Sequence, residues 1–469
     1  MTDTINIGRK DVAWSYAATF LQIGVGIVLL PFILKIFSQE TVAVWTIFLT
    51  VITLTGLFDF GFNPSFARNV SYVVSGVTEL KKTGHLVVEN RTGEIDYGLF
   101  KGMINAMRWF YARAACILFL LLATAGTYYI YTLLKTYSGN HMEVYIAWAI
   151  LIAINSYSLY TMYYDSLMQG KGLIKRSKQI KVVGQSVYLI LAVGLILLRL
   201  NLIAVVSAQA ASIVIIRLLS YRAVYTDDFK RHLHQVTTRS RKEILSYIYP
   251  NAVKVGLTGA GGFLVLRSST IIGSLYLSLG EIASYGITMQ VLHIISAIGG
   301  VYLLAYQPKI VQYRVQNDHH AIKRLYLKGC LLLFGAFLLG GLALVLLGEW
   351  VLNVIGSQTP LLSVSFILLA LVICWLEMNH TIAGQLLLTK NEVPFFKAAL
   401  FAGGLTLVLL VLFLKYTDLG VFGLILAPGL AQACYQNWKW PITAVEELQI
   451  KCCDITRYLR INKKKKDDV

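Results

Sequence analysis

The chain has 469 residues, of which 57% are hydrophobic and only 14% are charged, and its mean hydropathy is +0.64. Globular proteins carry about 25% charged residues, so this composition excludes a soluble enzyme, a disordered tail and a disulfide-stabilised scaffold. The 42 Lys and Arg outnumber the 24 Asp and Glu, which leaves a net charge of +18 on a polytopic membrane protein.

Apolar segments long enough to cross a bilayer recur along the whole chain. A bilayer core of about 30 Å needs about 20 residues of helix. The first segment is too long for a signal-peptide core and no small-residue cleavage site follows it, so we expect it to be retained. The twelve predicted spans are 13–36, 42–62, 113–134, 145–168, 182–199, 202–221, 247–270, 284–306, 328–348, 361–388, 395–415 and 419–436.

Lys and Arg are concentrated in every second loop, as the positive-inside rule requires of cytoplasmic loops. The loop after the second span holds Arg68, Lys81 and Lys82, and the tail ends in four lysines, 463–466. The alternate loops are short and carry few cations. We therefore predict cytoplasmic termini, and since topology explains most of the net charge, no nucleic-acid partner is expected.

The two halves of the predicted span series are weakly similar to each other. Residues 41–45 open the second span as residues 281–285 open the eighth, and a proline, Pro64 or Pro308, closes each. We predict an all-α fold of about 12 transmembrane helices in two six-helix halves around a central cavity, a transporter design. The predicted regions are the N-terminal half, the cytoplasmic linker, the C-terminal half and the basic cytoplasmic tail, at 1–225, 226–245, 246–440 and 441–469.

Motifs for catalysis, nucleotide binding and metal binding are missing. No H-E-x-x-H, Walker loop or G-x-S-x-G stands in a usable context, and the six cysteines have no metal-ligand spacing. We therefore predict a protein that is not an enzyme, has no cofactor and has no structural disulfide.

Two cations in the glycine-rich seventh span are candidates for contact with substrate. Lys254 and Arg267 are separated by about 20 Å of helix, and no acidic residue lies in that span to neutralise them. Because charge at membrane depth is costly and usually faces a cavity, this pair indicates an anionic cargo. Three other cations near span ends are expected to extend toward the interface instead: Arg108, Arg113 and Arg217.

Acidic residues and a histidine inside the spans are candidates for ion coupling. Asp59 precedes Gly61 and Pro64, and it can pair with Arg68 only if the helix distorts there; a local helix cap is the alternative. Glu377 and His380 share one helix face at i, i+3, and such a pair can bind a proton or form a polar contact between helices. Asp165 in the fourth span completes this set.

The segment 57–68, Leu-Phe-Asp-Phe-Gly-Phe-Asn-Pro-Ser-Phe-Ala-Arg, resembles the acidic-glycine segment of O-antigen flippases, the polysaccharide transporter (Wzx-like) branch of the multidrug/oligosaccharidyl-lipid/polysaccharide flippase superfamily. The turn 169–172 and the opening 283–285 of the eighth span are similar to that family as well. The twelve-span layout extends this resemblance over about residues 10–450.

The resemblance implies a multi-pass protein of the cell inner membrane that moves undecaprenyl-diphosphate-linked oligosaccharide units, contacts membrane lipids and works with other polysaccharide assembly proteins. Lys254, Arg267 and Arg68 are the implied substrate-binding residues, and Asp59, Asp165, Glu377 and His380 the implied ion-coupling candidates. The alternative is a cation-coupled multidrug extruder of the same superfamily. In-span bases outnumber in-span acids, which favours the anionic cargo.

Overall fold

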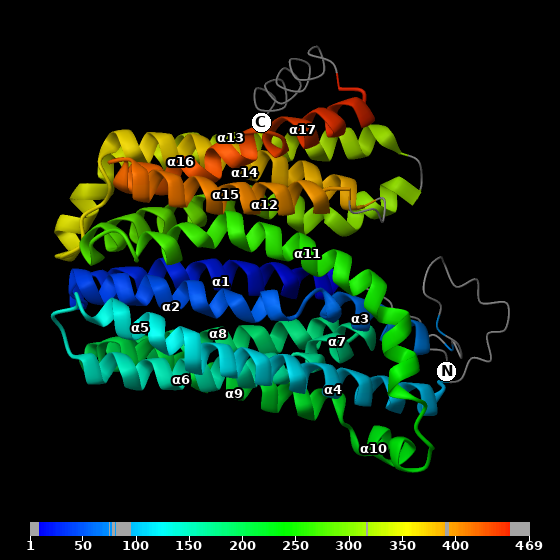
Figure 1. Cartoon of the computed structure of the whole chain (residues 1–469). Coiled ribbons are helices and arrows are strands. Elements are labelled where there is room, and N and C mark those ends of the chain that lie inside the picture. Colours follow the sequence, from blue (N-terminus) through cyan, green and yellow to red (C-terminus); the bar gives the residue numbers. More distant parts are fainter. Residues whose placement is uncertain are drawn as a thin grey trace. The chain divides into compact units, whose positions relative to one another are not determined.

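The computed structural model describes residues 9–74, 76, 80, 95–315, 318–389 and 394–450, and every regular element among these residues is a helix (Figure 1). Several cations lie outside the described residues: Lys81 and Lys82 of the loop after the second span, Lys390 after the tenth predicted span, and the lysines of the tail. The side chain of Lys254 lies outside them as well. The predicted all-α fold class is confirmed.

The helices follow each other with short connections. In the first part of the chain they are α1 (Arg9–Ile36), α2 (Gln39–Phe58), α3 (Phe62–Val74), α4 (Tyr97–Leu121), a π-helical turn (Leu122–Gly126), α5 (Thr127–Leu134), α6 (His141–Tyr160), α7 (Tyr163–Gly170), α8 (Ile174–Leu197), α9 (Asn201–Val224) and α10 (Asp227–His234). The remainder are α11 (Arg241–Gly273), α12 (Leu279–Val315), α13 (His319–Ile355), α14 (Val364–Leu388), α15 (Phe396–Tyr416), α16 (Gly420–Ala433) and α17 (Gln436–Glu447).

The helices group into two compact units. The first comprises Met1–Ile287 with Leu352–Pro360, and the second Thr288–Val351 with Leu361–Val469. α11, the seventh span, therefore belongs with the first unit. This grouping follows how closely helices pack, which is a different property from sequence duplication, so the six-plus-six division at 226–245 stays a prediction.

Eleven helical segments among the described residues are long and apolar enough to cross a membrane. The difference from the expected twelve lies at 419–436, where α16 has only 14 residues and ends before Tyr435. At 1.5 Å per residue this helix is about 21 Å long, shorter than a bilayer core of about 30 Å. The third span is longer than expected, because its helix already begins at Tyr97.

Two turns have local causes: one breaks the predicted second span, and the other follows the predicted fourth span. Between α2 and α3 the chain turns through Phe60 and Gly61, whose φ angles are 50° and 70°. Between α7 and α8 the N–H of Leu173 donates to the carbonyl of Met168 and that of Gly172 to Gln169. This is the helix-ending motif that favours glycine at the left-handed position, and Gly172 has a φ of 73°.

Loops of the first unit cluster as the alternation of charge predicts. Among the basic loops, the Lys101 ammonium donates to the Val236 carbonyl and the Ser71 hydroxyl to the Gly170 carbonyl. Among the cation-poor loops, Glu40 accepts from Ser138, and Glu143 accepts from the N–H of Leu202. Loops of like charge thus meet each other, which is the arrangement expected of a multi-pass membrane protein.

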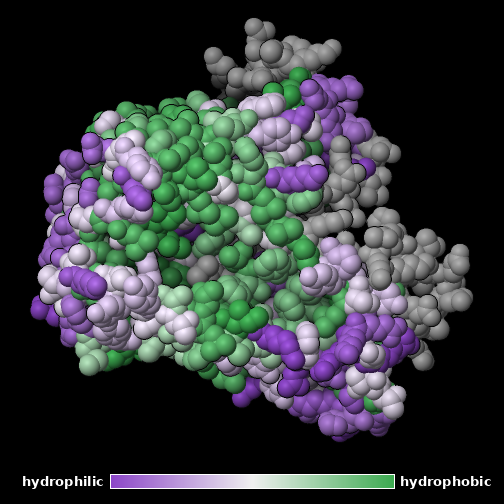
Figure 2. All heavy atoms as spheres, viewed as in Figure 1, coloured by the Kyte–Doolittle hydropathy of each residue, from purple (hydrophilic) through white to green (hydrophobic). Residues whose placement is uncertain are grey.

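Large apolar side chains cover much of the face seen in Figure 2, whereas hydrophilic ones gather around α10 and neighbouring helix ends. Ile190, Leu339 and Leu346 are each at least 70% exposed. In water such exposure would be costly, but it suits helices surrounded by lipid. Inside the first unit the fully buried side chains include Phe37, Phe48, Phe100 and Tyr111.

Candidate functional site

Asp59 lies at the break between α2 and α3 and is only 8% exposed. Its carboxylate accepts the N–H of Asn63 at 3.0 Å and 3.3 Å, and therefore caps the first turn of α3. The Tyr111 hydroxyl of α4 donates to Oδ1 of the same carboxylate at 2.6 Å. Of the two roles predicted for Asp59 in the chain's local structure, the helix cap is the one observed.

The pairing of Asp59 with Arg68 is not observed among the described residues. The chain does distort at Gly61, but Arg68 is exposed on α3 and lines a different pocket, together with residues of α8. The carboxylate instead finds Tyr111, a neutral donor from another helix.

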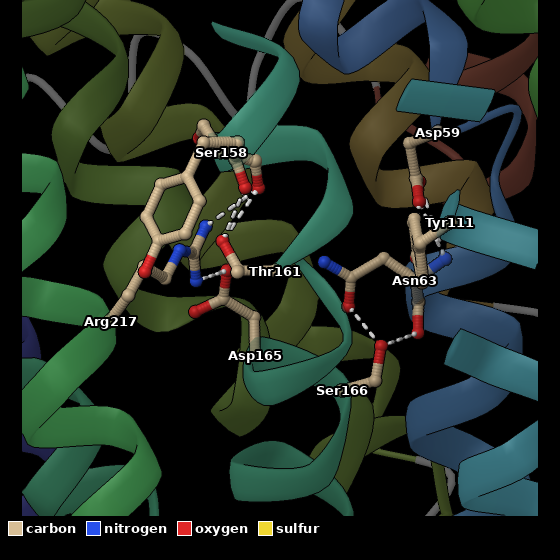
Figure 3. Close-up of polar contacts among 9 residues, drawn as sticks. Asp59, Asn63, Tyr111, Ser158, Thr161, Asp165, Ser166 and Arg217 are labelled. Atoms are coloured by element: carbon tan, nitrogen blue, oxygen red, sulfur yellow. Dashed lines mark hydrogen bonds and ion pairs between the residues drawn. The ribbon is translucent and has the colours of Figure 1, made fainter. Parts of the chain in front are cut away.

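Ser166 of α7 extends this polar contact toward the fourth span (Figure 3). Its hydroxyl donates to the carbonyl of Asn63 at 3.2 Å and to its side-chain oxygen at 2.9 Å. α3 and α7 are held closely here, since a Cβ on Gly170 would lie 2.4 Å from Val70. The capped helix start is therefore fixed from two sides, by α4 and by α7.

Asp165 and Arg217 point toward each other in Figure 3, and Arg217 Nη1 lies 2.9 Å from Asp165 Oδ2. A second guanidinium nitrogen, Nη2, lies 3.5 Å from the Ser158 carbonyl, at the end of α6 where the helix breaks. The expectation that Arg217 extends to the interface is wrong, because its side chain is 8% exposed and paired. The span turns at Thr161 and Met162, and this places Asp165 within reach of α9.

A cavity of ≈ 320 Å³ lies between the α2–α3 break and α11. Asp59 and Phe60 line one side, and Val255, Gly259 and Phe263 line the other. Close approach depends on glycine: a Cβ on Gly256 would lie 2.5 Å from Phe60, and one on Gly61 would lie 2.6 Å from Val255. The glycines of the seventh span thus bring α11 against the turn that holds Asp59, and α11 itself runs unbroken from Arg241 to Gly273.

The remaining predicted residues lie at separate places. Lys254 and Arg267 both belong to α11, where Arg267 is partly buried and has polar contacts. In the second unit, His380 is 9% exposed and its Nδ1 lies 2.9 Å from Asn437 Oδ1 of α17. Glu377, one turn earlier on α14, is partly exposed and also has polar contacts. The structure therefore joins Asp59 to neighbours of Asp165, and it gives His380 a partner from another helix.

Tyr111, Asn63 and Ser166 are site residues that sequence reasoning missed. Tyr111 precedes the predicted span at 113–134, so the hydropathy pattern does not place it at membrane depth. A helical pattern starting at Tyr97, after the Asp96 cap whose side chain accepts the N–H of Leu99, would have included it. Asn63 and Ser166 are 103 residues apart, and no linear pattern connects them.

No family model matches this chain, and no curated protein matches it either. Solved structures do. The lipid II flippase MurJ in an inward closed conformation has a TM-score of 0.61 at 12% identity, over 95% of this chain and 90% of that one. A multidrug resistance MATE family transporter of the MOP superfamily, inward-facing, has a TM-score of 0.58 at 13% identity, over 94% and 96%.

The chain shares the fold of these transporters. A third structure of this fold, a MOP superfamily transporter from Pyrococcus furiosus described as having a reverse polarity of its binding pocket, has a TM-score of 0.50 at 13% identity, over 94% and 96%. At these identities the likeness concerns the fold.

Proposed function

We propose that this protein is a flippase that moves undecaprenyl-diphosphate-linked oligosaccharide units from the cytoplasmic to the outer leaflet of the cell inner membrane, for O-antigen, capsule or exopolysaccharide assembly. The fold is shared with a protein named as a lipid II flippase. Short stretches of sequence resemble polysaccharide transporters, and the basic loops are those that the positive-inside rule assigns to the cytoplasm.

One observation carries the choice of an anionic cargo. Both acidic candidates of the first unit are already satisfied by the protein itself: Asp165 by Arg217, and Asp59 by Tyr111 and the start of α3. Holding an organic cation there would require breaking these bonds. Lys254 and Arg267 add two positive charges to α11, and a diphosphate bears the opposite charge.

Lys254 and Arg267 are proposed to contact the diphosphate and acidic sugars of the cargo. Arginine binds phosphate through two parallel hydrogen bonds, whereas lysine binds it as a point charge. In a flippase the cargo's lipid tail stays in the bilayer while the polar group crosses. A pair of cations about 20 Å apart along one helix would hold the polar group at successive depths.

Asp59 is the ion-coupling residue that the geometry favours. Its carboxylate borders a cavity against α11, the helix of the two cations, and it anchors the turn between α2 and α3. Protonation would weaken its bond to the Asn63 N–H and so loosen that turn. Asp165 is neutralised by Arg217 and His380 is held by Asn437, which makes both less suited to exchange an ion during transport.

The alternative, a cation-coupled multidrug extruder, is favoured by the likeness to the MATE family transporter. The two functions differ in what fails when the gene is removed. A flippase deletion should accumulate lipid-linked repeat units on the cytoplasmic side and abolish the surface glycan. A strain that keeps its glycan and becomes sensitive to cationic dyes would contradict the flippase.

Variants of the two cations test the site within the same strain. Arg267→Ala and Lys254→Ala should each reduce surface glycan while the amount of protein in the membrane stays normal. Arg113→Ala is the matched control, because Arg113 is an exposed in-span cation that stacks on Trp109 of its own helix. Full export by both α11 variants would overturn their assignment.

A further inference from the structure

A second cavity of the first unit, of ≈ 410 Å³, has the composition of an anion site. Its walls come from three segments: the face of α3 that carries Ala67, Arg68 and Ser71, the end of α7 at Gln169, and the first turns of α8. Volumes of this size are typical of small-ligand pockets. We call it the basic pocket, and it is distinct from the cavity beside Asp59.

The α8 wall of the basic pocket is one continuous helix face. Ile174, Ser177, Lys178 and Lys181 line it, at spacings of three and four residues. Arg176 belongs to the same turns but does not line the pocket. Two of the four residues on this face are lysines, and like charges at i, i+3 repel each other, so an anion between them would stabilise the arrangement.

The charge of the basic pocket is not balanced by the protein. Among the described residues, Arg68, Lys178 and Lys181 form no ion pair with a carboxylate. The start of α8 adds to this positive potential, since its N-cap is Leu173, no side chain caps its first amides and no acidic residue lies in its first turn. Helix starts of this kind favour negative charge.

The position of the pocket indicates where such an anion would come from. Directly after Lys181, α8 becomes an apolar helix, with Val183 and Ile190 exposed further along. The basic pocket thus lies where a membrane helix passes from polar to apolar surroundings, which is the level of lipid headgroups. It is also on the side of the basic loops, since Ser71 bonds to Gly170 at the same turn.

We propose that the basic pocket binds the phosphate or diphosphate group of an amphiphile at the membrane surface. Arg68 would hold phosphate oxygens from α3, Lys178 and Lys181 would hold them from α8, and Gln169, Ser71 and Ser177 would offer neutral hydrogen bonds. The source of the group is either an anionic phospholipid or an isoprenyl diphosphate. The proposal does not depend on the cargo proposed above.

The test measures binding to the purified full chain in detergent with two probes, short-chain phosphatidylglycerol and farnesyl diphosphate, and with short-chain phosphatidylcholine as the zwitterionic reference. Lys178→Gln/Lys181→Gln should weaken the binding of at least one anionic probe by about tenfold or more, since charge-assisted hydrogen bonds are lost. Arg68→Gln, on a different helix, should weaken the same probe. Arg176→Gln removes one positive charge, as Arg68→Gln does, but from outside the pocket. This variant should bind the probes like the wild type.

The two probes separate the sources. Loss with farnesyl diphosphate alone assigns the pocket to an isoprenyl diphosphate, loss with phosphatidylglycerol alone assigns it to a phospholipid, and loss with both supports phosphate recognition in general. Wild-type binding of both probes by the double variant and by Arg68→Gln, or an equal loss in Arg176→Gln, would overturn the proposal. Each variant is first checked for unchanged elution and melting temperature.

Discussion

Asp165 and Arg217 neutralise each other inside the first unit, whereas Arg68, Lys178 and Lys181 of the basic pocket share no carboxylate among the described residues. The first pair is buried and holds α7 against α9. The second group is more open to solvent and comes from α3 and α8. The contrast separates charge that maintains the fold from charge that is available to a ligand. Substitutions in the first region should therefore lower stability, and substitutions in the second should lower ligand binding.

The largest expected effect comes from breaking the buried pair. Arg217→Ala leaves Asp165 without its partner in a place where both side chains are at most 15% exposed. Losing one member of a buried ion pair costs about 3–5 kcal/mol of stability. The melting temperature in detergent should fall strongly, and Asp165→Asn combined with Arg217→Met should recover part of the loss. An unchanged melting temperature for the single variant would show that the pair does not hold the helices.

A smaller loss is expected at the capped helix start. Tyr111→Phe removes one hydrogen bond to the Asp59 carboxylate, and bonds to charged groups contribute about 1.5–3 kcal/mol. Asp59 keeps its bond to the Asn63 N–H, so the fold should persist. If Asp59 also couples an ion, the pH profile of transport should shift in this variant. Tyr129→Phe is the control, since Tyr129 is a tyrosine of the same span that bonds to Ser274.

The contact between α11 and the α2–α3 turn can be tested with two glycines three residues apart. Gly256→Ala would place a Cβ 2.5 Å from Phe60, whereas nothing lies within 4 Å of a Cβ on Gly259. Overpacking of the first kind costs about 1–3 kcal/mol, while alanine at the second position should gain up to about 1 kcal/mol of helix stability. Thermal unfolding of the two variants should therefore move in opposite directions, and parallel shifts would contradict the close approach.

Lys171 is intermediate between the buried ion pair and the open basic pocket, because it is partly buried and its partners are neutral. Its ammonium donates to the Val224 carbonyl and lies 3.6 Å from the Phe229 ring centre, and burial lowers its pKa to about 8. In the unfolded chain the pKa is about 10.4. Between these values the unfolded state binds more protons, so stability should rise with pH.

The comparison that isolates this effect is wild type against Lys171→Met. Between pH 8 and pH 10 the free energy of unfolding of the wild type should rise by about 1 kcal/mol relative to that of the variant. The rise is smaller than the full pKa difference would give, because solvent screens part of the charge. Below pH 8 Lys171 is charged in both the folded and the unfolded chain. The difference in unfolding free energy between wild type and variant should therefore be constant there. A difference that stays flat throughout, measured by denaturant unfolding, would mean that Lys171 is solvated.

Hydropathy and loop charge predicted the helical membrane fold, because long apolar runs between basic loops have few other structures open to them. What they could not predict lies in local geometry and long-range contact. Helix boundaries differ from the predicted ones by several residues at three places: the short α16, the break at Phe60 and Gly61, and the early start of α4. Asp165 meets an arginine 52 positions away, and tertiary packing alone determines that partner.

The same limit applies to the predicted cations. In the sequence, Lys178 and Lys181 follow the fourth predicted span and fit a basic loop, since a linear sequence does not show that α3 and α8 enclose a cavity between them. A pair between Arg68 and Asp59 was one of two alternatives, because the two residues bracket Gly61 and Pro64. In the structure the turn between α2 and α3 separates the two side chains, and Arg68 lines the basic pocket.

The central claim, an anionic lipid-linked cargo, is tested most directly by reconstituting the purified protein into liposomes. The measurement is the movement of a fluorescent isoprenyl-diphosphate-linked oligosaccharide between leaflets, with an organic cation dye as the competing cargo. We predict flipping of the lipid-linked sugar by the wild type, a clear reduction in Arg267→Ala and no transport of the dye. Dye transport without movement of the lipid-linked sugar would contradict the account.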